Sequence, residues 1–125
     1  MSDSEFKLGQ IGVIMLGVQD VKRALEFYGD KLGLSVTSAF EGFAFLGTTG
    51  ATLVLSEPLA RANSTTVGAT EVVFSVPDVR AAYEALRAKG VEFTHEPRQV
   101  SGATWAANFR DPDGHALSVF GPEHA

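Results

Sequence analysis

The chain has 125 residues, of which 45% are hydrophobic and 20% charged, a composition that predicts one folded domain with its own core. Its net charge of −5, without any basic stripe, argues against a nucleic-acid partner, and the absence of cysteine excludes disulfides and thiolate metal sites. No apolar run is long enough to span a membrane, and the N-terminal segment is too polar for a signal peptide. We therefore expect a cytoplasmic protein with no membrane partner.

The first half of the chain predicts one helix between strands. Residues 11–18 are typical of a strand, and Asp20 is placed to cap a helix that ends near Gly33. Apolar residues recur at helical spacing behind this cap. Turn residues then separate three short predicted strands, at 35–40, 43–47 and 51–56.

The second half repeats this order of elements. "VQDVKRALEFYGDKLGL", from Val18, resembles "VPDVRAAYEALRAKGV", from Val76, at a constant offset of 58 residues. A predicted strand at 70–76 precedes Asp78, a second helix cap, and Gly90 stands where that helix should end. The remaining predicted strands are 92–95, 104–109 and 116–120.

This repeat predicts an α+β fold in a single domain, residues 1–125. Two βαβββ modules in tandem, at about 9–58 and 70–122, are joined by a polar linker at about 59–69. Neither module buries enough surface to be stable alone. We therefore expect the two to form a curved, partly closed mixed sheet around a concave pocket.

A tight turn and a strand end the second module, in "NFRDPDGHALSVFGP", which begins at Asn108. Pro112 presets φ, the two aspartates can cap nearby N–H groups, and Gly114 tolerates positive φ. The alternation that follows places Ser118 on the face of the strand opposite its apolar neighbours.

The helix of each module must cover one face of its sheet, so strand alternation identifies the residues on the other face. This helix-free, concave side is where we expect a small-molecule pocket. We also expect Met15 and Val54 to leave apolar surface exposed there in a single chain. The residues that alternation places on this side are Ile11, Val13, Met15, Gly17, Thr52, Val54, Ser56, Glu71, Val73, Ser75, Ala116, Ser118 and Phe120.

Three stretches, "VIMLGVQDVKRALEFYGDKLGL", "EVVFSVPDVRAAYEALRAKGVEF" and "NFRDPDGHALSVFGP", resemble the vicinal oxygen chelate superfamily. That family includes glyoxalase I, extradiol dioxygenases, and fosfomycin and bleomycin resistance proteins. The resemblance implies that metal-using members hold their ion at the positions of four residues here, namely Val13, Val54, Glu71 and Ser118. Of these, only a glutamate is a competent ligand for a divalent metal. We therefore predict no metal site of the family type.

Several side chains have two interpretations. Glu71 is either a desolvated base or ligand contact, or a carboxylate at the wet end of its strand, paired with an arginine or water. Asn108 either orients a ligand or lies on an exposed edge, and Arg98 either closes over an acidic ligand or is a solvated loop residue. The aromatic residues near the strands either form a stacking pocket or pack in the core; they are Phe40, Phe43, Phe45, Trp105, Phe109 and Phe120.

The predicted function is that of a metal-free protein, similar to bleomycin resistance proteins, which binds a small hydrophobic or aromatic compound without a cofactor. The resemblance further implies a homodimer with pockets shared between the subunits. In the alternative, the protein is a glyoxalase-like lyase or isomerase, or a dioxygenase, with an atypical site in which Glu71 is catalytic. The predicted ligand contacts are Val13, Met15, Phe45, Val54, Glu71, Val73, Trp105, Asn108, Ser118 and Phe120.

Overall fold

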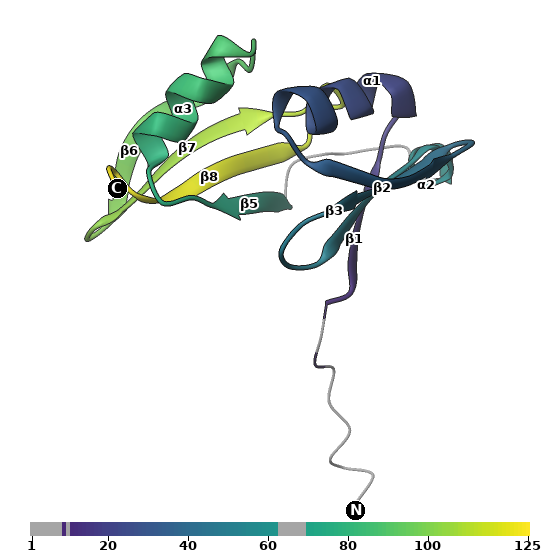
Figure 1. Ribbon diagram of the computed structural model, residues 1–125, viewed down its shortest axis with the longest axis horizontal. Helices are drawn as coiled ribbons and strands as arrows, with labels where there is room; N and C mark the ends of the chain where they lie inside the picture. Colours follow the sequence, from purple (N-terminus) through teal and green to yellow (C-terminus); the bar gives the residue numbers. More distant parts are fainter. Residues whose placement is uncertain (1–8, 10, 63–69) are drawn as a thin grey trace, which may run out of the picture.

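A computed structural model describes residues 9, 11–62 and 70–125 of the protein (Figure 1). The first module consists of β1 (Val13–Gly17), α1 (Val21–Leu25), the π-helical η2 (Glu26–Lys31), β2 (Ser35–Phe40), β3 (Phe43–Gly47) and β4 (Thr52–Ser56). A short helix, α2 (Glu57–Ala62), follows it. The second module consists of β5 (Glu71–Ser75), α3 (Val79–Ala88), β6 (Phe93–Ser101), β7 (Thr104–Arg110) and β8 (Ala116–Pro122). No helix in the described ranges is long and apolar enough to cross a membrane.

The two sheets have the same strand order, β1-β4-β3-β2 in the first and β5-β8-β7-β6 in the second. In each sheet the first strand pairs in parallel with the last, and the other pairs are antiparallel. This matching order confirms the predicted α+β fold and its repeated βαβββ pattern. The sheets are not closed into one: β1 and β5 are edge strands of separate sheets.

The predicted helix ends are confirmed. The carboxylates of Asp20 and Asp78 each accept hydrogen bonds from first-turn backbone N–H groups, of 2.9 and 3.4 Å at Asp20 and 2.8 Å at Asp78. Gly33 and Gly90 follow the helices with φ of +81° and +94°. Gly114 in the Asp-Pro-Asp-Gly turn has φ of +91°, as the turn predicts.

The start of the predicted linker, 59–69, is helical, because α2 runs on directly from β4. Its first turn is capped by Ser56 Oγ, which accepts a backbone hydrogen bond of 3.0 Å. The helix packs so closely on β1 that a Cβ at Gly17 would lie 3.0 Å from Ala60 Cα. A larger residue at this position would therefore require α2 or β1 to shift. Residues 63–69 of the linker lie outside the described residues.

The two modules meet through the Asp-Pro-Asp-Gly turn and the first helix. Tyr28 Oη donates a hydrogen bond of 2.8 Å to Asp111 Oδ2, and the other oxygen of Asp111 accepts from the N–H groups of Asp113 and His115 (3.0 and 2.7 Å). His115 Nε2 donates to the carbonyl oxygen of Gly17 at 2.7 Å. We call this set of contacts the module joint.

A single hydrophobic core lies on the helix-covered side of both sheets. The rings of Phe27, on η2, and Phe109, on β7, pack together with their centroids 6.3 Å apart, and this contact connects the two modules. The helices α1, η2 and α3 therefore cover one face of each sheet, and on the opposite face α2 covers only the Gly17 end of the first sheet. The largest fully buried core residues are Tyr28, Phe109, Leu46, Leu55 and Leu117.

Candidate functional site

The open face of the first sheet carries a row of apolar side chains. Strand register places Met15, Val54 and Phe45 next to one another on β1, β4 and β3. Val13 and Met15 are 49% and 43% exposed, and the Phe45 ring stacks on that of Phe40, with centroids 5.8 Å apart. The expected exposure is confirmed for Met15 but wrong for Val54, which has no exposed surface. Val54 is covered because it lies on an inner strand with a larger side chain on each side.

The open face of the second sheet carries polar side chains beside two exposed apolar ones, Val73 and Phe120, which are 47% and 40% exposed. Strand register aligns Val73, Ser118, Asn108 and His95 across β5, β8, β7 and β6. Asn108 Nδ2 donates a hydrogen bond of 2.9 Å to Glu71 Oε2, while Asn108 Oδ1 is buried and has no hydrogen-bond partner. The Glu71 side chain is exposed rather than desolvated, and its partner is a neutral amide rather than an arginine.

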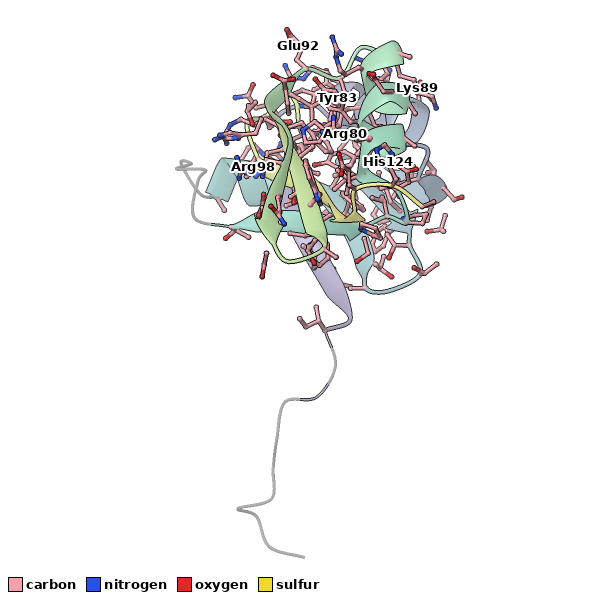
Figure 2. All side chains as sticks on the ribbon, turned by 90° about the vertical axis from the view of Figure 1, so that its left-hand side faces the viewer. Arg80, Tyr83, Lys89, Glu92, Arg98 and His124 are labelled. Carbon is pink, nitrogen blue, oxygen red and sulfur yellow. The ribbon has the colours of Figure 1, made fainter. Side chains whose placement is uncertain are left out.

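The last strand of this face, β6, is longer than predicted. The predicted strand 92–95 extends to residue 101, with three register shifts along its pairing with β7. Arg98 therefore lies in a strand, opposite Ala106 and in line with Phe120, and not in a loop. Figure 2 shows Arg98 and α3 on opposite sides of the β6–β7 hairpin. The sequence pattern placed Arg98 in a loop because the bulges interrupt the alternation of β6 beyond residue 95.

Trp105 does not join the residues of the open face. Its ring packs against the core, with the guanidinium carbon of Arg80, on α3, 5.2 Å from the ring centroid. Arg80 Nε is also held by Glu123 Oε2 at 2.7 Å. Trp105 and Asn108 are three residues apart in β7, and an odd separation puts two side chains on opposite faces of a strand. This spacing can be read from the sequence, and it predicts that Trp105 and Asn108 do not share a face.

A single chain does not bring the two open faces together. Val13 and Val54 lie on the first sheet, whereas Glu71 and Ser118 lie on the second, and no strand pairing among the described residues joins the sheets. The donor set of these four positions does not fit a divalent metal, since two are valines and Ser118 is a buried, neutral hydroxyl. Elsewhere in the part of the chain that the structure describes, no group of three or more His, Cys, Asp or Glu residues could hold a metal ion.

Solved structures support the fold. A glyoxalase/bleomycin resistance protein/dioxygenase from Nocardioides superposes with a TM-score of 0.76 at 26% identity, and the match covers 92% of this chain and 84% of that one. TnmS3, an antibiotic binding protein from Streptomyces sp. CB03234, gives a TM-score of 0.78 at 22% identity, covering 94% of this chain and 99% of that one.

Sequence comparison agrees with this result. A probable lactoylglutathione lyase from Vibrio cholerae is 30% identical over 117 residues, which cover 84% of this chain and 85% of that protein. Residues 10–119 match the model of the family described as the Glyoxalase/Bleomycin resistance protein/Dioxygenase superfamily. The chain therefore belongs to this superfamily, which the sequence resemblance had indicated.

Proposed function

We propose that the protein binds a small hydrophobic or aromatic compound against the open faces of its sheets, without a metal or other cofactor. The observation that carries this proposal is the donor set at the four positions that the family resemblance assigns to metal ligands. Val13, Val54 and Ser118 offer neither imidazole nor carboxylate, and Glu71 alone cannot hold a divalent ion. What the open faces do offer is apolar surface with a few polar groups, the usual composition of a small-molecule site.

The two faces favour a ligand with an apolar body and a hydrogen-bond donor. Val13, Met15 and Phe45 supply apolar contact on the first sheet. On the second sheet, the buried Oδ1 of Asn108 lacks a donor, and an unsatisfied buried acceptor costs about 1–3 kcal/mol. A turn of the Asn108 side chain that exposed this oxygen to an N–H or O–H group of the ligand would recover that cost, and the exposed negative charge of Glu71 favours a cationic donor.

A second copy of the chain would complete the pocket. Both β1 and β5 are edge strands with one unpaired side, and exposed apolar residues, Ile11 and Val13 among them, lie at the β1 edge. We infer a homodimer in which β1 of one copy lies beside β5 of the other, so that an apolar and a polar open face enclose one ligand. Each dimer would contain two such pockets, because the pairing is reciprocal.

One further fact supports the ligand-binding role, and another fits the inferred location. TnmS3, which shares this fold, is described as an antibiotic binding protein, so the fold is compatible with binding of small molecules without further assumptions. The chain also contains no cysteine, which fits the cytoplasmic location that we infer for it but does not require it.

The first test is elemental mass spectrometry on protein purified without chelators or a histidine tag, followed by thermal unfolding with a panel of aromatic antibiotics and metabolites. We expect no stoichiometric transition metal, even after addition of Mn, Fe, Ni and Zn, and a raised Tm with some compounds.

Val13→Asp should abolish that rise in Tm. Val36→Asp is the matched control, because Val36 is 48% exposed, against 49% for Val13, but pairs with the core residue Leu46 on the other face. A bound stoichiometric metal, or equal effects of the two variants, would contradict the proposal.

The enzymatic alternative is a glyoxalase-like lyase or isomerase, or a dioxygenase, with Glu71 as its acid–base group. It is favoured by the relative described as a probable lactoylglutathione lyase and by the position of His95 beside the Glu71–Asn108 pair. Glu71→Gln separates the two functions. An enzyme that depends on this proton transfer should lose a factor of about 10² to 10⁴ in rate, whereas a binding protein should retain affinity for neutral ligands.

A further inference from the structure

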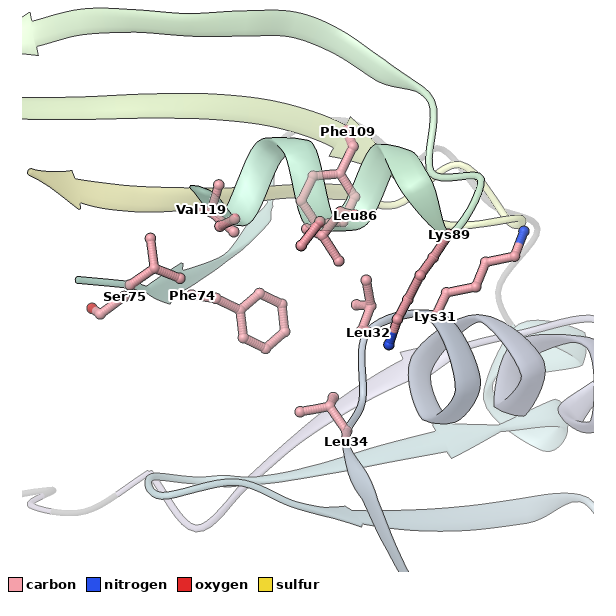
Figure 3. Close-up of a pocket in the computed structure, with 12 residues that line it drawn as sticks. Lys31, Leu32, Leu34, Phe74, Ser75, Leu86, Lys89, Phe109 and Val119 are labelled. Carbon is pink, nitrogen blue, oxygen red and sulfur yellow. The ribbon is translucent and has the colours of Figure 1, made fainter. Parts of the chain in front are cut away.

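A cavity of about 360 Å³ lies between the two modules, on the helix-covered side of the sheets (Figure 3). Leu32 and Leu34, which follow η2, line it from the first module, and Phe74 and Leu86 line it from the second. Its volume is within the range of natural small-molecule sites, and most of its lining is hydrocarbon. The remaining apolar lining residues are Val76, Ala82, Ala85, Phe109 and Val119.

This cavity is separate from the open faces. Phe74 alternates with Val73 along β5, and Val119 alternates with Ser118 along β8, so the cavity and the open face use opposite sides of the same strands. Ser75, at the end of β5, also lines the cavity, but Asn108, Glu71 and Ser118 do not. The two sites can be altered independently by substitution.

The charged residues that line the cavity are both cations, Lys31 and Lys89. Neither has a carboxylate at ion-pairing distance within the described residues. Figure 3 shows Lys89 extending from the end of α3 toward Leu32. The Nζ of Lys31 lies close to the same helix end, since a Cβ built at Gly90 would be 3.7 Å from it.

The partial negative charge at the C-terminal end of α3 is too small to neutralise two ammonium groups. The C-terminus of α3 carries a partial charge equivalent to about −0.5, which is smaller than the charge of one lysine. The mouth of the cavity is therefore positive, although the whole chain has a net charge of −5. A ligand whose polar end is anionic fits this mouth, and a hydrocarbon tail fits the lining.

We propose that the cavity binds a free medium-chain fatty acid, with its carboxylate between Lys31 and Lys89 and its tail against Leu32, Phe74 and Leu86. Such a ligand contacts both modules, and because it binds only the folded arrangement it stabilises that arrangement by mass action. The site does not depend on the proposed function of the open faces.

The test compares three probes of equal tail length, decanoate, 1-decanol and decylamine, below their micelle concentrations and at low salt, by calorimetric titration and thermal unfolding. We expect decanoate to bind most tightly and to raise Tm most. The double variant Lys31→Glu/Lys89→Glu should weaken decanoate binding by roughly three- to tenfold and strengthen decylamine binding, which reverses the order of the probes. Lys31→Arg/Lys89→Arg should keep the original order.

Three controls locate the binding. Urea unfolding of the charge-reversed variant should match that of the wild type, and Lys31→Gln/Lys89→Gln replaces it if it does not. Ala82→Leu, which narrows the cavity, should weaken all three probes, whereas Val13→Asp on the open face should weaken none. The proposal is overturned if the three probes keep their order of affinity after charge reversal, or if Val13→Asp abolishes decanoate binding. It is also overturned if light scattering shows that the cavity variants change the oligomeric state, because the cavity would then be an interface between copies.

Discussion

The two modules share one strand order but bury their helices differently. In the first module, η2 buries two adjacent aromatic residues, Phe27 and Tyr28, which are 6% and 0% exposed. In the second, the regular helix α3 buries only Val79 completely and leaves Tyr83 half-buried at its surface. The first helix is thus a central part of the core, whereas α3 lies on its margin, beside the cavity between the modules.

The open faces also differ, although Met15 and Val73, at the same offset of 58, are both apolar and similarly exposed. Positions 58 residues apart that face the core are apolar in both modules, for example Val18 and Val76. On the open face the same offset relates an exposed valine, Val13, to the acidic Glu71. Packing requires similar side chains at equivalent core positions, but it places no such requirement on a face that no helix covers. The difference between the open faces is therefore where ligand specificity can be built.

The largest effect should come from truncating the first helix rather than the second. Phe27→Ala should lower the free energy of unfolding by about 3–5 kcal/mol, because it leaves a cavity in the middle of the core. Tyr83→Ala should cost only about 1–2 kcal/mol, since that ring contacts Phe93 at one edge of the core. Urea denaturation of both variants measures the difference. Equal losses would show that the two helices contribute equally to the core.

The module joint should be the next most sensitive region. Burial raises the pKa of Asp111, and burial together with the charge of Asp111 raises the pKa of Tyr28. The tyrosine therefore keeps its proton, and its Oη donates a hydrogen bond to the Asp111 carboxylate. Asp111→Ala leaves three donors without their acceptor and should cost about 2–4 kcal/mol. Tyr28→Phe removes one of these hydrogen bonds and should cost less. Glu84→Ala, which removes an ion pair with Arg87 in which both side chains are exposed, is the control and should cost less than about 1 kcal/mol.

Much of the fold follows from local patterns in the sequence. The aspartate caps, the glycines after the helices and the alternation in β1, β4, β5 and β8 depend on residues that are close together along the chain. The repeat then supplies the order of the elements twice. These features determined the α+β class, and the alternation also identified which side of β1 and β5 is open.

Other features depend on contacts that no local pattern records. The helix α2 forms where Gly17 lets it approach β1, and the module joint brings together Tyr28 and Asp111, which are 83 residues apart. Bulges in β6 change the face on which His95 and Arg98 lie. The site residues were expected to share one pocket, but the described residues place them on two separate sheets, an arrangement that no local pattern records.

A smaller effect should distinguish the two edge strands, because α2 covers the end of β1 and no helix of the described residues covers the equivalent part of β5. Gly17→Ala should lower the free energy of unfolding by about 1–3 kcal/mol, since the new methyl group would press on the backbone at Ala60. Ser75, which occupies the equivalent position 58 residues later, is exposed, and Ser75→Ala should change stability by less than about 0.5 kcal/mol. Thermal unfolding of the two variants measures the contrast. A neutral Gly17→Ala would mean that α2 can move away from β1 without cost.

The smallest effect concerns the helix cap of the second module and its dependence on pH. The pKa of Asp78 lies below its usual value of 3.8, first because the backbone N–H of Ala81 and then because that of Ala125 donates to the carboxylate. A carboxyl group whose pKa is lower in the folded than in the unfolded state stabilises the fold above the unfolded pKa, and this contribution is lost as the pH falls through the folded pKa.

Asp78→Asn keeps a side chain that can cap the helix but does not titrate. The stability advantage of the wild type over this variant, measured by urea denaturation, should therefore be constant from pH 7 to about 5 and shrink below about 4. The slope from Asp111, whose raised pKa acts in the opposite direction, is present in both proteins and cancels in the difference. An advantage that stayed constant or grew at low pH would show that the charge of Asp78 does not stabilise α3.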